Sequence, residues 1–371
     1  MMKTIYLSAV NIKDGGPRTI LNSILVILLD ILPKDCEIHI ITNSFVEKSD
    51  EIFFKDSRVH LHIFNWPLRG LASRLIFEYI FLPYYMLGRR ASIWFSLNDV
   101  SSFIRAKKRY VYFHNPSPFI PSRLFGFFPV SFLAHGLLYN LIYFINSRNY
   151  DNVFVQQQWM ANVVSYRYKL NNVKVAKPTI PHRANGIDRK VEAKNSRITR
   201  FIYPALPRFA KNHSVIIDAV QRINKLTTRE FEVIFTLDGL ENEYSKNIFS
   251  RCKSINEIKF VGVLDKSNMS SLYENSDVLI FPSLLETWGL PISEAMEMGL
   301  ILFLSDLPYA HEVASGYSRS YFFKPTDSTQ LADLMINYLN FKLGDASEGV
   351  IVNADFSNLN ELVHYILKSA E

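Results

Sequence analysis

Several features that mark common classes of protein are missing from this sequence of 371 residues. Its two cysteines, Cys36 and Cys252, lie far apart and form no CxxC pattern, which argues against a zinc ribbon and a thiol redox enzyme. We expect both to be buried thiols in a reducing cytosol. There is no DxD triplet and no group of histidines with zinc spacing, so we expect no metal and no other cofactor.

Other motifs are absent as well. Without a GxGxxG pattern, a nicotinamide-binding site is poorly supported. Residues 1–10 lack an export segment with a cleavage site, so we expect them to form a first core strand in a cytoplasmic protein. The net charge of +6 fits an anionic ligand or an anionic membrane surface and by itself indicates neither. We expect no nucleic acid among the partners.

Apolar residues, in contrast, make up 48% of the chain and aromatic residues 14%, ample for the cores of the two domains that this length predicts. In the first half, short apolar runs alternate with helical patterns. This alternation favours a doubly wound parallel α/β sheet. Strands are expected over 4–9, 37–42, 58–64, 91–97, 109–114 and 151–156, and helices over 18–32, 69–87, 123–146 and 157–168.

A second alternation begins at Phe201, after a charged stretch over 190–200 that is typical of a linker. We therefore expect an N-terminal Rossmann-like domain over 1–188 and a C-terminal one over 189–355. Strands of the second domain are expected over 201–203, 231–236, 257–261, 277–281 and 300–304, and a last helical pattern covers 356–370.

Two glutamates, Glu286 and Glu294, lie on either side of a glycine turn after the apolar strand over 277–281. Pro291 suits the first turn of a following helix, where a missing N–H costs nothing. Open α/β sheets bind ligands at this end of a strand. Ionised carboxylates accept hydrogen bonds from sugar hydroxyls. The free N–H groups of Gly289, Leu290 and Ile292 are expected to point to the same place and suit an anionic or polyhydroxylated ligand. Taken alone, however, the pair could equally be a solvated loop residue and a favourable first-turn charge.

The order of residues around this pair resembles the retaining glycosyltransferases of family 4, of bacterial surface-polysaccharide type. The resemblance covers 258–315 and is carried by Phe260-Val261-Gly262-Val263, Leu272-Tyr273, Ser276-Asp277-Val278-Leu279-Ile280-Phe281-Pro282-Ser283, Glu286-Thr287-Trp288-Gly289-Leu290-Pro291, Glu294-Ala295-Met296, Gly299 and Ser305-Asp306-Leu307-Pro308. It implies the GT-B fold, in which two Rossmann-like domains face each other across a cleft. The first would bind the acceptor and the second a nucleotide sugar, and the helix over 356–371 would pack on the first.

The resemblance also implies roles for the two glutamates. Glu286 would hold hydroxyls of the donor sugar and Glu294 the ribose, while the amides of Trp288, Gly289 and Leu290 would face the sugar and phosphates. Arg208 and Lys211 match the position of the family's phosphate-binding pair. Alone, this pair could be ordinary surface charge. Arginine and lysine would neutralise the leaving diphosphate in place of a metal ion.

In the N-terminal half, Gly15 and Gly16 match a glycine loop that the family places beside the donor phosphates and acceptor; a plain tight turn is the alternative. His114 ends a predicted strand, where the family has a histidine near C6 of the sugar, although a histidine there is often structural. Asn115 replaces the aspartate that many members carry next. Asn98 and Asp99 are weaker candidates for binding the acceptor.

Asp238 and Val263 are assigned to the pocket for the base, although Asp238-Gly239 fits an ordinary turn equally well. Residues 127–145 contain no Asp, Glu, Lys or Arg. Because a spanning helix would separate two halves of one sheet, we reject that interpretation. Two remain: a buried core helix, or a helix on the cytoplasmic leaflet beside a basic rim.

Together with these patterns, the family resemblance implies a metal-independent, retaining enzyme that transfers a sugar from a nucleotide diphosphate to a glycan hydroxyl. The expected acceptor is a lipid-linked oligosaccharide in the synthesis of O-antigen, capsule or exopolysaccharide, at the inner face of the plasma membrane. Two alternatives stay open. One is a GT-B sugar-nucleotide epimerase, and the other is a catalytically silent nucleotide-sugar-binding scaffold.

Overall fold

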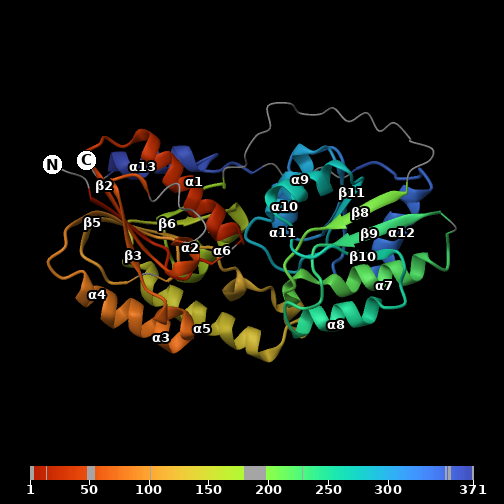
Figure 1. Ribbon diagram of the computed structural model, residues 1–371, viewed down its shortest axis with the longest axis horizontal. Coiled ribbons are helices and arrows are strands. Elements are labelled where there is room, and N and C mark those ends of the chain that lie inside the picture. Colours follow the sequence, from red (N-terminus) through yellow and green to blue (C-terminus); the bar gives the residue numbers. More distant parts are fainter. Residues whose placement is uncertain are drawn as a thin grey trace. The chain divides into compact units, whose positions relative to one another are not determined.

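The computed structural model describes residues 4–13, 15–47, 55–100, 102–178, 198–227, 229–346, 349 and 352–369. The chain divides into two compact units (Figure 1). The first comprises Met1–Phe125, Pro129–Thr179 and Asn353–Glu371, and the second comprises Gly126–Phe128 and Ile180–Val352. The predicted boundary between 188 and 189, and the predicted linker up to 197, lie outside the described residues.

A parallel sheet of seven strands forms the centre of the first unit, in the order β3-β2-β1-β4-β5-β6-β7. The strands are β1 (Thr4–Ser8), β2 (Glu37–Thr42), β3 (Val59–Ile63), β4 (Ala91–Ser96), β5 (Ala106–Tyr112), β6 (Asn152–Val155) and β7 (Val173–Val175). The order reverses between β1 and β4, and this switch point is where ligands bind in open α/β sheets.

Side chains on successive residues of β1 alternate between two cores, as the period of two in a strand requires. Ile5 and Leu7 pack with the helices α1 (Gly15–Ile31) and α13 (Leu359–Ser369), which contact each other. Figure 1 shows these two helices side by side, although they come from opposite ends of the chain. Tyr6 faces the other side and packs with Phe77 and Trp94.

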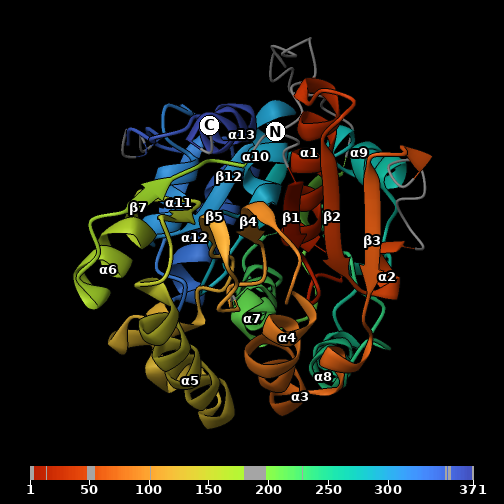
Figure 2. The same ribbon diagram turned by 90° about the vertical axis from the view of Figure 1, so that its left-hand side faces the viewer.

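Helical elements cover the opposite face of this sheet (Figure 2). They are η2 (Trp66–Arg69), α3 (Leu71–Ile76), the π-helical turn η3 (Phe77–Phe81), α4 (Leu82–Tyr85) and α5 (Val130–Ser147). The other short elements of this unit are α2 (Ser44–Glu47), η4 (Ser117–Phe119) and α6 (Gln158–Tyr168). Hydrogen bonds from Arg74 to Tyr139 and from Asn146 to Tyr79 join α3 and η3 to α5.

The single helix predicted over 123–146 is two elements, η5 (Ser122–Phe127) and α5. The break falls at Pro129, because proline disfavours the helical region for the residue before it. One face of α5 is buried and the other is not: Val130, Leu137 and Leu141 are exposed. The buried face of α5 packs in a core through Tyr139, Ile142 and Tyr143, so both alternatives for 127–145 stay open. No helix among the described residues is both long and apolar enough to cross a membrane.

The second unit is built on a parallel sheet of six strands in the order β10-β9-β8-β11-β12-β13. The strands are β8 (Thr199–Tyr203), β9 (Phe231–Phe235), β10 (Ile258–Phe260), β11 (Val278–Phe281), β12 (Ile301–Ser305) and β13 (Ser320–Phe323). The helical elements are η6 (Phe209–Lys211), α7 (His213–Ile223), α8 (Glu243–Cys252), α9 (Lys266–Glu274), α10 (Leu290–Glu297), α11 (Pro308–Val313) and α12 (Ser328–Leu339).

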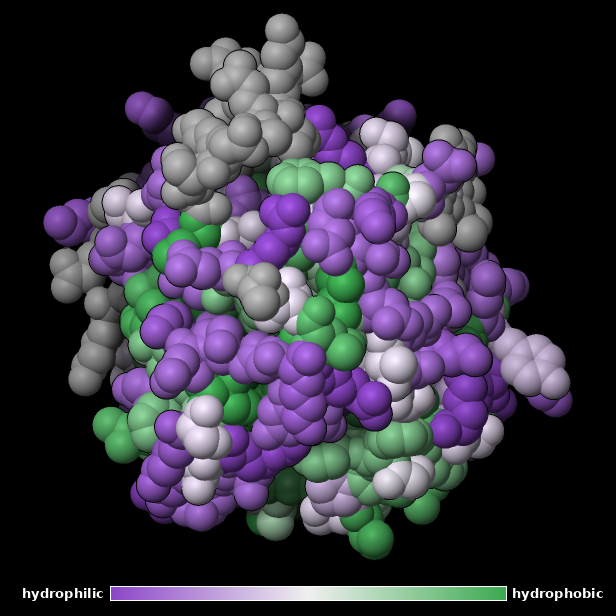
Figure 3. Space-filling model, turned by 90° about the vertical axis from the view of Figure 1, so that its right-hand side faces the viewer, coloured by the Kyte–Doolittle hydropathy of each residue, from purple (hydrophilic) through white to green (hydrophobic). Residues whose placement is uncertain are grey.

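The side of the second unit that Figure 3 presents is mainly hydrophilic, with apolar side chains in separate groups. All four residues of β11 are fully buried, as expected for a central parallel strand with helices on both faces. The strand order reverses between β8 and β11. The predicted fold, two Rossmann-like doubly wound domains, is confirmed. Cys36 and Cys252 are both buried free thiols, as predicted.

Candidate active site

The two loops that follow β8 and β11 meet at the switch point of the second sheet, because these strands are neighbours. Hydrogen bonds join the two loops. The carbonyl of Ala210 accepts hydrogen bonds from the Leu284 N–H at 2.8 Å and from the Ser283 hydroxyl at 3.1 Å. Asn212 adopts a left-handed conformation, and its amide donates to the carbonyls of Pro282 and Pro325.

These hydrogen bonds bring Lys211 and Glu286 into direct contact, and the lysine ammonium donates a hydrogen bond to Glu286 Oε1. Both side chains are largely buried, with 19% of Lys211 and 14% of Glu286 exposed. The ammonium also lies 5.5 Å from the centre of the Phe281 ring. Arg208 precedes η6 in an extended conformation and is exposed. The predicted phosphate-binding pair is therefore one half-buried lysine and one arginine at the surface.

Helix α10 starts at Leu290 after Gly289, whose φ of 96° lies in the left-handed region. A Cβ at Gly289 would lie 3.1 Å from Ile292 Cδ1, so both the backbone and the packing favour glycine. Within the described part of the chain, the backbone N–H groups of Gly289 and Leu290 have no protein acceptor, as expected at a helix start.

One expectation about this turn needs correction. The N–H of Ile292, predicted to face the ligand, donates to the Gly289 carbonyl at 2.9 Å. The side chain of Trp288 is buried, and its indole N–H donates to the Ser293 hydroxyl at 3.0 Å, so only its backbone is available to a ligand. The helix ends near Gly299, whose N–H and that of Leu300 close a Schellman motif on α10.

Glu294 lies in the second turn of α10, not the first, because the helix already begins at Leu290. It is exposed, and its Oε2 accepts a hydrogen bond from the Tyr273 hydroxyl at 2.7 Å. Tyr273 is buried at the end of α9, and burial, then the charge of Glu294, raises the pKa of its hydroxyl well above the usual value. The tyrosine stays protonated and fixes one oxygen of the carboxylate.

Asp238 forms an ordinary turn with the residues that follow it. Its Oδ1 accepts from the Leu240 N–H, and its own N–H donates to Glu241 Oε1. A Cβ added at Gly262 would lie 3.9 Å from Asp238 Cβ, so this turn and the loop after β10 are adjacent. Val263 in that loop is 71% exposed. Asp238 is therefore a residue of an ordinary turn, and this turn lies beside the loop that was predicted to border the base. The two interpretations of Asp238 do not exclude each other.

In the first unit, the loops after β1 and β4 meet at the corresponding switch point. The Asn98 side chain accepts from the Asn11 N–H at 3.1 Å and donates to the Ser8 hydroxyl at 2.8 Å. Gly15 has a φ of 70° and opens α1, which starts three residues earlier than expected. Asn98 is 2% exposed, and its bonds give it a structural role in holding these loops.

Asp99 organises the end of β5 around His114. It adopts a left-handed conformation with φ of 66°, and its Oδ1 accepts from the N–H groups of His114 and Asn115 and from the Tyr143 hydroxyl at 3.0 Å. The Asn115 Oδ1 in turn accepts from the Ser117 N–H. Like Asn98, both predicted acceptor-binding side chains support the local backbone.

His114 is buried and stacks on Tyr112. Burial lowers the pKa of its imidazole to about 4, with a smaller opposing effect from Asp99, so the ring is neutral near pH 7. The Gln156 side-chain nitrogen lies 3.3 Å from His114 Nδ1. Because an amide N–H₂ group only donates, Nδ1 must accept and Nε2 must carry the proton. Nε2 has no partner within the described residues.

Sequence reasoning identified His114 but not Gln156, and identified Glu294 but not its partner Tyr273. No local spacing links these residues. The sequence signals were the place of Tyr273 in the segment that resembles the family, and a polar residue, Gln156, at the end of a predicted apolar strand.

Residues 185–348, less than half of the chain, match the family described as Glycosyl transferases group 1. Solved structures match almost the whole chain. A glycosyltransferase from Rickettsia africae is 16% identical, with 100% of this chain and 92% of that one covered and a TM-score of 0.62. The fold is that of the GT-B glycosyltransferases. No curated protein matches the sequence.

Two further GT-B structures are similar. HepE from Anabaena, in complex with UDP-glucose, has 16% identity and a TM-score of 0.61, over 100% of this chain and 98% of that one. WaaG, a glycosyltransferase involved in lipopolysaccharide biosynthesis, has 10% identity and a TM-score of 0.65, over 91% and 90%. Together these structures support the GT-B fold for this chain.

Proposed function

We propose that this protein is a retaining glycosyltransferase that moves a sugar from a nucleoside diphosphate to a hydroxyl of a lipid-linked glycan, without a metal ion. The observation that carries the proposal is the Lys211–Glu286 pair at the switch point of the second sheet, beside the open amides of α10. A cation and a carboxylate held together there suit a ligand that presents phosphates next to sugar hydroxyls.

In the proposed reaction, the acceptor oxygen forms a bond to C1 of the sugar on the face from which the diphosphate leaves. The bond from C1 to the phosphate oxygen breaks, and the proton of the acceptor hydroxyl passes to the leaving diphosphate. Lys211 and Arg208 neutralise the charge that develops on the diphosphate, the role that a metal ion fills elsewhere. The Gly289 and Leu290 amides add donors to the phosphates.

The remaining residues position the donor. Glu286 accepts hydrogen bonds from sugar hydroxyls once Lys211 turns to the phosphates, and the His114 Nε2–H donates to a hydroxyl near C6. Glu294, with one oxygen fixed by Tyr273, accepts from the ribose with the other. The turn at Asp238 and the exposed Val263 border the base. Gly15 and Gly16 leave room beside the phosphates because they carry no side chain.

The test of this function is a donor screen followed by a transfer assay. One of UDP, GDP and dTDP should raise the melting temperature most, since ligands that bind the native state stabilise it by mass action. The matching sugar nucleotide is then incubated with glycosides bearing an alkyl chain. We expect a product whose anomeric configuration, read from NMR coupling constants, equals that of the donor.

The alternatives give different outcomes in the same assay. An epimerase converts the donor to a second sugar nucleotide without any acceptor. A silent scaffold binds the nucleotide but shows neither transfer nor slow donor hydrolysis. Stabilisation by no nucleotide at all contradicts the proposal, and an inverted product contradicts the retaining mechanism.

We also propose that the exposed face of α5 and α3 rests on an anionic membrane surface, where a lipid-linked acceptor resides. Leu137 is 71% and Leu141 55% exposed, and they border a hollow of ≈ 610 Å³ that Arg167 also lines. Ile80 on the neighbouring turn is 67% exposed. Exposed arginines that precede or follow these apolar side chains in the chain would complement anionic lipid headgroups: Arg89, Arg90, Arg123 and Arg148.

Replacing both Leu137 and Leu141 by glutamate is expected to reduce binding to anionic vesicles at least about tenfold, because each leucine contributes about 1.5–3 kcal/mol when buried. Sedimentation with vesicles at low and high salt measures the effect. Leu226→Glu is the control, since Leu226 is 69% exposed in the second unit. If the unaltered protein stays in the supernatant with anionic vesicles at low salt, the membrane proposal is wrong.

A further inference from the structure

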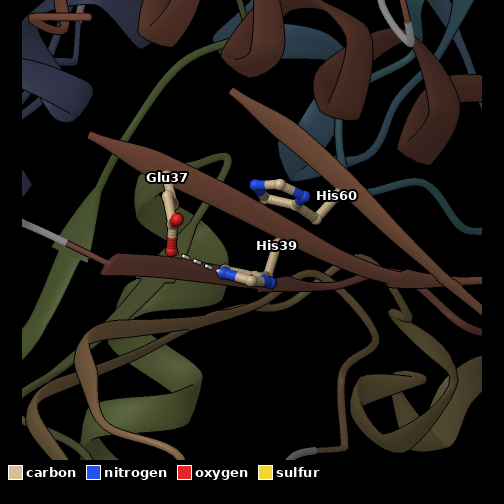
Figure 4. Close-up of side chains that lie close together, drawn as sticks. All are labelled: Glu37, His39 and His60. Carbon is tan, nitrogen blue, oxygen red and sulfur yellow. Dashed lines mark hydrogen bonds and ion pairs between the residues drawn. The ribbon is translucent and has the colours of Figure 1, made fainter. Parts of the chain in front are cut away.

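Three side chains that sequence spacing does not connect lie together on the first sheet. Glu37 and His39 come from β2, and His60 comes from the edge strand β3. The register pairs His39 with His60, so all three side chains lie on the same face (Figure 4). One donor atom from each lies within 4.8 Å of the other two. The absence of a zinc spacing in the sequence therefore did not exclude a metal-ligating cluster.

We propose that Glu37, His39 and His60 bind a zinc ion that joins β3 to β2. Two imidazoles and one carboxylate form a donor set that zinc accepts, with water in the fourth position. The site is separate from the proposed catalytic one. It lies towards the amino ends of the strands, whereas Asn98 and His114 follow carboxyl ends.

The distances fit such a site with little movement. Glu37 Oε2 and His39 Nε2 are 3.3 Å apart. In a tetrahedral site with bonds of about 2.0–2.2 Å, two donors lie about 3.3–3.5 Å from each other. The His60 ring stacks on His39 with ring centres 4.8 Å apart. The donor atoms of all three residues lie within 4.8 Å of one another, so the His60 nitrogen must approach by about 1.5 Å at most to reach tetrahedral spacing.

A chain of hydrogen bonds on the Nδ1 side of His39 fixes the orientation of its ring and leaves Nε2 directed towards Glu37. The other nitrogen of His39, Nδ1, lies 3.0 Å from His62 Nε2, and His62 Nδ1 lies 2.8 Å from the Tyr85 hydroxyl. With zinc on Nε2, His39 Nδ1–H donates to His62, and His62 Nδ1–H donates to Tyr85. Metal-binding histidines commonly donate their second N–H in this way.

The exposure of the cluster also suits a metal. With 15% of His39 and 38% of Glu37 exposed, an ion can enter from solvent.

Equilibrium dialysis of the chelator-treated full chain against zinc, followed by elemental analysis, tests the site. We expect one zinc per chain and a rise in melting temperature with zinc. His60→Gln or His39→Gln should weaken binding at least 100-fold and abolish that rise. His62→Gln, which removes a supporting partner, should weaken binding by about 10–100-fold. The exposed His364 provides the control, and His364→Gln should bind zinc like the unaltered protein.

Circular dichroism checks that each variant is folded. If His39→Gln does not fold, His60→Gln still decides, because His60 lies on an edge strand and is partly exposed. The proposal is overturned if the chain binds no stoichiometric zinc. It is equally overturned if His60→Gln binds zinc as well as the unaltered protein, or if His364→Gln lowers binding as much.

Discussion

Replacing Glu286 by glutamine is expected to lower kcat by roughly 10²–10³-fold, the effect seen when one group that stabilises a transition state is removed. Glutamine has nearly the same shape and its carbonyl still accepts a hydrogen bond from Lys211, so the fold should persist. The amide, however, lacks the charge that strengthens bonds from sugar hydroxyls as positive charge develops at C1. Steady-state kinetics with saturating donor measures the loss.

The chain offers a matched control for this substitution. Glu243 forms an ion pair with Lys246 at 2.6 Å, but both side chains are highly exposed and the pair lies on α8. Because exposed pairs contribute little, Glu243→Gln should leave both kcat and the melting temperature nearly unchanged. A Glu286→Gln enzyme that turns over like the unaltered one removes the basis for the proposed sugar contact.

The second large effect is expected at Lys211. Lys211→Ala should reduce kcat by roughly 10²–10³-fold and weaken binding of the free nucleoside diphosphate, because Lys211 is largely buried whereas Arg208 in the same loop is exposed. Lys211→Arg keeps the charge but changes its geometry, so we expect partial recovery. Calorimetry for the diphosphate and kinetics for turnover separate the two effects, and Lys246→Ala is the exposed control.

The pair of substitutions gives a sharper test than either alone. Since Lys211 and Glu286 contact each other, the losses in the double variant should not multiply. Residues that act as one unit in catalysis show such non-additivity. If the fold-loss in kcat of the double variant equals the product of the two single fold-losses, the residues act independently. The proposed movement of Lys211 from Glu286 to the phosphates is then wrong.

Much of the fold could be predicted because parallel strands in an α/β protein are short, apolar and evenly separated by helices. β2 agrees with its predicted range, and β11 differs by one residue. The strands that were missed, β7 and β13, are short and lie at sheet edges, where the apolar signal is weakest. Pro129 was visible in the sequence, yet its effect, the division of one helical pattern into η5 and α5, appeared only in the structure.

The candidate site was predicted in part for a similar reason. Residues that follow parallel strands gather at one edge of a sheet, so Lys211 and Glu286 could be placed there from their positions alone. Their direct contact depends on the adjacency of β8 and β11, which are far apart in the chain. The partners Tyr273 and Gln156 were not predicted, because each reaches its site from a different element.

The sequence by itself determined the alternation of strands and helices, and hence which loops carry the polar residues of the site. It did so because periodicity and turn residues act locally, within one strand or helix. The tertiary structure decided which side chains meet: Lys211 with Glu286, Gln156 with His114, and Glu37 and His39 with His60. Each of these contacts joins segments distant in the chain, and only strand order and register bring them within bonding distance.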